Sequence, residues 1–165
     1  MSKAASKGFT LVEVMVALMV LSIGLLGIAK LAFSSVQSNS SAYMRTQASE
    51  LTQEIFDAMR ANRNQAALGA YNVAIGAFPG AGTNCSQAVC TDVLMAAYDV
   101  SVWKARLAAA FPGGDGSVVT ALVANPNGNQ EITAVVTVQW NDAVAQQTFG
   151  QGGNQTLSVV AESVL

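Results

Sequence analysis

The chain has 165 residues, of which 52% are hydrophobic and only 11% are charged, and its formal net charge is −2. The charged fraction lies well below the roughly 25% of soluble domains, and the acidic balance gives no overall basic footprint, so we expect no nucleic-acid partner. Histidine is absent, which excludes histidine-based nucleophiles and acid–base systems. No other local catalytic motif is present, so we expect neither enzymatic activity nor a cofactor. The length predicts a single globular domain.

The N-terminal residues combine a short basic segment with a long apolar one. Lys3 and Lys7 precede the run from Phe9 to Ala29, in which Glu13 is the only charge. These 21 residues are enough to cross a hydrocarbon core of about 30 Å as a helix. The positive-inside tendency places residues 1–8 in the cytoplasm and the chain after the run outside it. We therefore expect a membrane-spanning helix over residues 9–29.

Other interpretations of this run are a plain anchor that contains Glu13, a conventional secretory signal and a buried core helix. Glu13 is unusual in an anchor, because a charge near the bilayer centre costs roughly 2.5–3.5 kcal/mol on insertion scales. The run exceeds the roughly 7–15 apolar residues of a secretory signal, and no clean small-residue cleavage site follows it. An apolar run of about 18 residues or more also argues against a core helix.

The junction Gly8-Phe9-Thr10-Leu11-Val12-Glu13 resembles the class III signal of type IV pilins and pseudopilins. The resemblance implies that residues 1–8 are a leader and that prepilin peptidase cuts between Gly8 and Phe9. It implies that the new N-terminal Phe9 is then N-methylated. It also implies that Glu13 serves subunit assembly, by attracting the amino terminus of a neighbouring subunit.

Helical patterning continues beyond the apolar run. No proline or glycine occurs from Lys30 to Asn62, and Leu51, Ile55 and Met59 recur at helical spacing. The sequence predicts one helix from Phe9 to about Asn62, apolar all round in its first half and amphipathic in its second. Other residues predicted on or near its buried side are Tyr43, Met44, Ala48, Ala58 and Asn62.

Residues 66–91 are predicted to be a connecting region, because glycines and a proline punctuate them. Cys85 and Cys90, the two cysteines of the chain, lie within it. Such a pair is readily oxidised in an extracytoplasmic compartment, so we expect a disulfide that closes a small loop. We expect no metal site there, because the chain has neither histidine nor a second cysteine pair.

A second helix is predicted from a cap at Thr91 or Asp92 to about Ala110. It ends at Phe111-Pro112-Gly113-Gly114-Asp115-Gly116, which we interpret as a tight turn rather than a phosphate or calcium loop. The apolar positions predicted for this helix are Leu94, Met95, Tyr98, Val102, Trp103 and Leu107.

Val/Thr-rich strands are predicted at residues 117–124, 131–140 and 156–164, and residues 143–149 are a candidate for one more short strand. Alternation in the second strand is imperfect, so we expect a partly buried sheet. The order of elements predicts an α+β fold. As in type IV pilins, a long N-terminal helix would pack on a small antiparallel sheet with an extra helix, and residues 30–165 would form the extracytoplasmic domain.

A second resemblance lies in the C-terminal half. The stretch from Tyr98 to Gly116, with Trp103 and the Pro-Gly-Gly turn, is similar to PilV-type minor pilins. So is the later Val136-Thr137-Val138-Gln139-Trp140. The resemblance implies a minor pilin that takes part in type IV pilus assembly or initiation, in a priming or tip complex with other minor pilins and the major pilin. It also implies roles in twitching motility and surface attachment.

The same resemblance implies a location in the inner membrane before assembly, with a periplasm-facing domain, and on the pilus or cell surface afterwards. One alternative is a minor pseudopilin of a type II secretion system, which shares the leader and the helix. A second alternative is a membrane-anchored extracytoplasmic binding module that uses Trp103 and Trp140. For these two tryptophans we predict core packing rather than ligand stacking.

Overall fold

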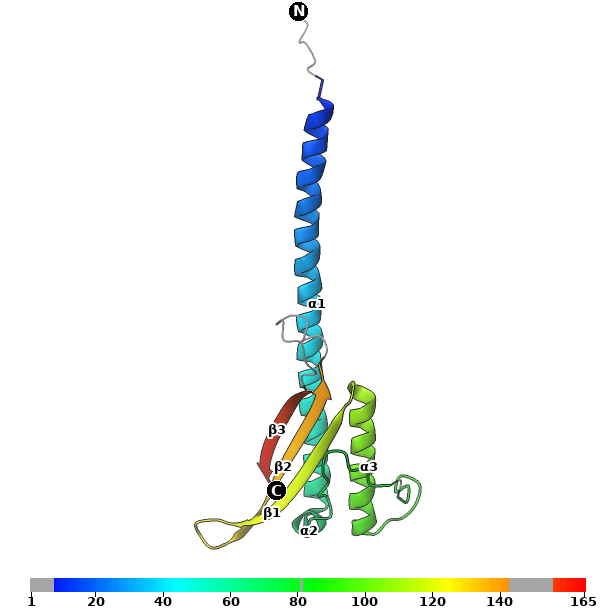
Figure 1. The fold of residues 1–165 in the computed structure, drawn as a ribbon. Helices are drawn as coiled ribbons and strands as arrows, with labels where there is room; N and C mark the ends of the chain where they lie inside the picture. The colour runs from blue at the N-terminus through cyan, green and yellow to red at the C-terminus, as the bar shows by residue number, and fades with distance from the viewer. Residues whose placement is uncertain (1–7, 81, 143–155) are drawn as a thin grey trace, which may run out of the picture. The chain divides into compact units, whose positions relative to one another are not determined.

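The computed structural model describes residues 8–80, 82–142 and 156–165 (Figure 1). The elements follow the order α1 (Leu11–Ala61), α2 (Arg63–Ala67), α3 (Asp92–Ala110), β1 (Asp115–Ala124), β2 (Gln130–Asn141) and β3 (Thr156–Val164). A long helix, a second helix and antiparallel strands confirm the predicted α+β fold. The candidate strand at 143–149 lies outside the described residues. Contacts within the chain define two compact units, Met1–Asn39 and Ser40–Leu165, and α1 contributes to both.

The described part of the N-terminal unit is the first part of α1. The helix begins at Leu11 rather than at Phe9, because Thr10 acts as its N-cap: Thr10 Oγ1 accepts a hydrogen bond from the backbone N–H of Glu13 at 3.3 Å. Its most apolar 18-residue window has a mean hydropathy of 2.5, and none of that window is buried. This segment is therefore long and apolar enough to cross a membrane, and no described part of the chain covers it.

The second unit has its core between the last part of α1, helix α3 and one face of the sheet. Figure 1 shows the strands crossing the end of α1, with α3 running alongside that end. The predicted helical spacing on α1 is confirmed for Ile55 and Met59, which are buried together with Ala48, Thr52 and Phe56. Tyr43 was predicted on the same side but is 66% exposed.

The described strands form one antiparallel sheet in the order β1-β2-β3. Strand β2 alternates regularly between buried and half-buried side chains. The sheet is therefore partly buried, as predicted. The buried row of β2 consists of Ile132, Ala134, Val136, Val138 and Trp140.

Helix α3 has the predicted bounds, and Thr91 is its N-cap. The predicted apolar positions are only partly right, because Leu94 is 41% exposed and the buried side consists of Ala96, Val100, Trp103, Lys104 and Leu107. A lysine at a core position was not expected, since lysine is almost never fully buried unless it is paired.

The region predicted as a connection also contains regular structure. It begins in the last residues of α2, and Val73 forms an isolated antiparallel bridge with Val118 of β1. A five-residue helix and a single bridge carry too little periodicity to be read from sequence.

Candidate functional site

The predicted junction lies at the start of α1. Gly8 and Phe9 precede the helix, and the Phe9 side chain is 82% exposed. Glu13 lies in the first turn of α1, where the helix dipole favours a carboxylate. No cation among residues 8–80, 82–142 and 156–165 forms an ion pair with Glu13. The described chain thus presents an accessible Gly8–Phe9 peptide bond and, one turn later, a carboxylate without a counter-ion.

The turn between α3 and β1 is a close packing arrangement. A Cβ added to Gly114 would lie 2.2 Å from the carbonyl oxygen of Leu107. One added to Gly116 would lie 2.5 Å from a ring carbon of Trp103. Gly113 has a φ of +62°, a conformation that side chains disfavour. The interpretation of this stretch as a tight turn is confirmed. Close contacts explain why positions 114 and 116 are glycine, and the positive φ explains position 113.

The two tryptophans belong to this packing arrangement. Trp103 donates from Nε1 to the carbonyl oxygen of Leu51 at 2.9 Å, which ties α3 to α1. Trp140 stacks on Phe111 with ring centroids 5.3 Å apart. Both indoles are 1% exposed, so they pack in the core as predicted and present no stacking surface to a ligand.

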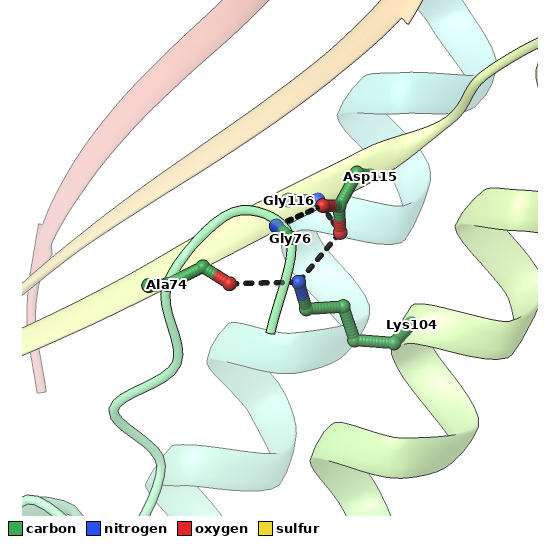
Figure 2. Close-up of polar contacts among 5 residues, drawn as sticks. All are labelled: Ala74, Gly76, Lys104, Asp115 and Gly116. Atoms are coloured by element: carbon green, nitrogen blue, oxygen red, sulfur yellow. Dashed lines mark hydrogen bonds and ion pairs between the residues drawn. The ribbon is translucent and has the colours of Figure 1, made fainter. Parts of the chain in front are cut away.

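The strongest electrostatic feature of the second unit is a buried ion pair, shown in Figure 2. Lys104 is 0% exposed, and its Nζ donates to Asp115 Oδ1 at 2.5 Å and to the carbonyl oxygen of Ala74 at 2.9 Å. The Asp115 carboxylate also accepts from the backbone N–H of Gly76 at 2.6 Å and of Gly116 at 2.7 Å. The pair therefore joins helix α3, strand β1 and the loop around residues 74–76.

These contacts set the ionisation of Asp115. Burial alone would raise the pKa of its carboxyl group, but the hydrogen bonds from Lys104, Gly76 and Gly116 outweigh burial and hold the pKa below its usual value. The sequence did not predict this pair. The available signal was the helical spacing of Lys104 with Val100 and Leu107 on the buried side of α3.

The expected disulfide is present in the structure. Cys85 and Cys90 are bonded, with Cα atoms 5.6 Å apart, and they close a loop whose Val89 is fully exposed. Among the described residues, no cluster of three or more His, Cys, Asp or Glu side chains could hold a metal ion.

Comparison with known families gives two matches. The prokaryotic N-terminal methylation motif matches residues 3–29, which include Gly8, Phe9 and Glu13. The family described as type IV pilin Tt1218 matches residues 30–101. The chain is a type IV pilin-like protein. No curated protein and no solved structure matches it in the same comparisons.

This family assignment explains the exposed apolar segment of α1. The methylation motif implies processing by a prepilin peptidase and assembly into a pilus with other pilins. The motif and the apolar helix fit a pilin that is anchored in a membrane and then assembled at the cell surface. Type IV pilins are structural proteins rather than enzymes.

Proposed function

We propose that this type IV pilin-like protein is a PilV-type minor pilin that is cut between Gly8 and Phe9 and N-methylated at Phe9. It then enters a priming or tip complex of a type IV pilus with other minor pilins and the major pilin, and supports twitching motility and surface attachment. The observation that carries the proposal is the start of α1: an apolar helix that no described residue covers, with one carboxylate, Glu13, that forms no ion pair with a described residue.

An uncovered apolar helix is stable only in lipid or against other apolar helices. A carboxylate within it is expensive unless a cation approaches. Cleavage before Phe9 creates that cation, since it leaves a positively charged amino group at the new end of the chain. Pairing of Glu13 with the amino terminus of a neighbouring subunit neutralises both charges. Cleavage before Phe9 and the Glu13 carboxylate therefore act together in subunit assembly.

The assignment to the PilV type is supported by the turn between α3 and β1. Several residues that carry the resemblance pack at this turn: Gly116 lies against Trp103, Gly114 lies against Leu107, and Trp140 stacks on Phe111. If this chain and PilV-type pilins join the helix to the sheet in the same way, they need the same packing residues at this turn. The exposed disulfide loop fits a domain in an oxidising compartment outside the cytoplasm.

Mass spectrometry of the native N-terminus tests the processing step. We expect the chain to begin at N-methylated Phe9. A chain that begins at Met1, or downstream of Ala29, would contradict the proposal.

The assembly step is tested by substituting Glu13 and measuring the amount of the protein in sheared pilus fractions. Glu13→Val removes the charge, and we expect it to abolish incorporation. Glu13→Asp is the matched control, because it retains the charge with one methylene fewer, and we expect it to incorporate better than Glu13→Val. Equal incorporation of wild type and Glu13→Val would contradict the pairing.

Deletion of the protein tests its role in the cell. We expect fewer pili and reduced twitching, with type II secretion unchanged. Normal pili together with a secretion defect would instead identify a minor pseudopilin.

A further inference from the structure

The two edges of the sheet differ in how their backbone groups are satisfied. Val118 of β1 and Val73 exchange two backbone hydrogen bonds of 3.0 Å each. The backbone N–H and C=O groups of the even-numbered residues of β1 therefore point away from β2. Three successive outward N–H groups of β1 have acceptors within the chain. Gly116 donates to Asp115 Oδ1, Val118 to the carbonyl oxygen of Val73, and Thr120 to Asn72 Oδ1. The β1 edge is therefore largely closed.

Among the described residues, no strand pairs with the outer edge of β3. Leu165 donates its backbone N–H to the carbonyl oxygen of Ile132 at 2.9 Å. The backbone N–H and C=O groups of the odd-numbered residues of β3 therefore point toward β2, and those of the even-numbered residues point outward. In the part of the chain that the structure describes, none of the outward N–H groups has a hydrogen-bond partner. These outward residues are Thr156, Ser158, Val160, Glu162 and Val164.

Among the described residues, the core is also less fully covered at this edge than under β2. The inner side chains of β2 next to β3, Ala134 to Trp140, are at most 1% exposed. The inner row of β3 is only partly buried, although it packs against the same core; it consists of Leu157, Val159 and Ala161. One more strand beside β3 would cover this apolar row and provide acceptors for the outward N–H groups.

We propose that β3 is the docking edge for a strand of a different pilin-like subunit, which joins the sheet as its fourth strand. Unpaired edges are ready templates for such strand addition, in which the backbone supplies affinity and alternate side chains supply specificity. The partner strand carries apolar side chains on the face that meets Leu157, Val159 and Ala161. This inference rests on the proposed function, since it takes its partner from the set of assembling pilins.

Strand direction distinguishes a different subunit from a second copy. Ser41 near the start of this part of α1 bonds to Asp142, beside the start of β3, and Arg60 near the end of α1 bonds to Ser163 near the end of β3. Strand β3 therefore runs in the same direction as α1. Strand β1 runs the same way, because both strands are antiparallel to β2.

Two copies that paired their β3 edges antiparallel would have residues 40–61 of their α1 helices pointing in opposite directions, whereas the proposed function has subunits enter one pilus in a common orientation. Two copies in the same orientation would offer each other only parallel edges, one of them closed. A different subunit with a strand that runs opposite to α1 makes the antiparallel pairing, which is the more stable of the two.

The experiment uses the full chain, produced in its own cells together with its own pilin-like subunits. A photo-crosslinking amino acid replaces Ser158 on the open edge or, as a control, Val119, which is 55% exposed on β1. We expect a crosslink from position 158, and none from position 119, to a different chain that carries an N-terminal methylation motif.

The edge itself is tested with Val160→Pro, which removes one outward N–H. Edge strands tolerate proline where the N–H faces away from the sheet, so we expect this variant to fold. Val160→Ala is the matched control, because it keeps the N–H. We expect Val160→Pro to lower the yield of the crosslink at least tenfold and Val160→Ala to leave it unchanged. Should Val160→Pro not fold, Glu162→Pro makes the same test one outward position further along.

A crosslink to a second copy of this chain, equal yields in the proline and alanine variants, or no crosslink from position 158 would overturn the proposal. The N-terminus is read by mass spectrometry in the same sample. A chain that still begins at Met1 would contradict the proposed function, whereas the crosslinks decide on the β3 edge separately.

Discussion

Replacing Lys104 by methionine removes the ammonium group from the buried ion pair and keeps much of the volume of the side chain. The substitution removes the bond to Asp115 and the bond to the carbonyl oxygen of Ala74. Asp115 then remains as a carboxylate whose side chain is only 13% exposed. Breaking a buried pair in this way costs about 3–5 kcal/mol, because the remaining charge is left uncompensated.

The lower end of that range applies here, since Asp115 keeps the N–H groups of Gly76 and Gly116. We therefore expect Lys104→Met to lower the free energy of unfolding by about 3 kcal/mol. The unit Ser40–Leu165 has 126 residues, and about 2.1 cal/mol/K of unfolding entropy per residue gives about 0.26 kcal/mol/K. The corresponding fall in Tm is about 11 °C.

Unfolding can be followed by tryptophan fluorescence of the full chain in detergent, since both tryptophans are buried in this unit. Arg106→Met is the matched control on the same helix. Arg106 forms an exposed ion pair with Glu54, and such pairs contribute about 0–1 kcal/mol. Equal losses of stability in Lys104→Met and Arg106→Met would refute the importance that we assign to the buried pair.

The pair also predicts a dependence on pH. The pKa of Asp115 is lower in the folded chain than its usual value of 3.8, so the folded state binds fewer protons than the unfolded state in this range. The stabilisation is complete above the usual pKa and is lost as pH falls through the folded pKa. We expect the difference between wild type and Lys104→Met to shrink below about pH 4.

Three further predictions concern the same unit. Gly116→Ala places a Cβ 2.5 Å from a ring carbon of Trp103 and should lower the free energy of unfolding, measured with denaturant, by about 1–3 kcal/mol or more. Gly80→Ala is the control, because its Cβ would lie in open space, and it should lower that free energy by less than about 0.5 kcal/mol. Burial raises the pKa of the Asp99 carboxyl group in the folded chain, so the free energy of unfolding falls as pH rises through that pKa and the carboxyl group ionises. Asp99→Asn should therefore raise the free energy of unfolding at pH 7 and lose this advantage below pH 3. Reduction of the Cys85–Cys90 disulfide should lower the unfolding free energy by about 2 kcal/mol, measured with and without reductant, and no change would show that the loop is uncoupled from the core.

The sequence predicted the elements of this fold because their signals are local. The bounds of α3 and β3 follow from a capping threonine, a Pro-Gly-Gly stop and a Val/Thr-rich run. The long helix follows from apolar periodicity, and its start differs by two residues because the N-cap is Thr10. Such signals depend on neighbours a few residues apart, which is what a sequence displays directly.

The features that the sequence did not predict depend on residues that are far apart along the chain. Lys104 can be buried only because Asp115 and the carbonyl oxygen of Ala74 meet its ammonium group. The bridge between Val73 and Val118 likewise joins segments 45 residues apart. The open β3 edge is visible only when the direction of each backbone N–H is known. The N-terminal junction was recognisable because its residues form one contiguous motif.

Glu13 and Lys104 are two solutions to the same physical problem, a charge in apolar surroundings. Lys104 has its counter-ion eleven residues away in the same unit, so its charge is compensated as soon as that unit folds. Glu13 has no counter-ion among the described residues, and folding of the described chain provides none. A charge that the chain compensates itself can be buried when the fold forms, whereas a charge left for another molecule makes association favourable. The β3 edge is a second case, where N–H groups rather than a carboxylate have no partner among the described residues. Both features lead us to expect a protein that is completed by its neighbours.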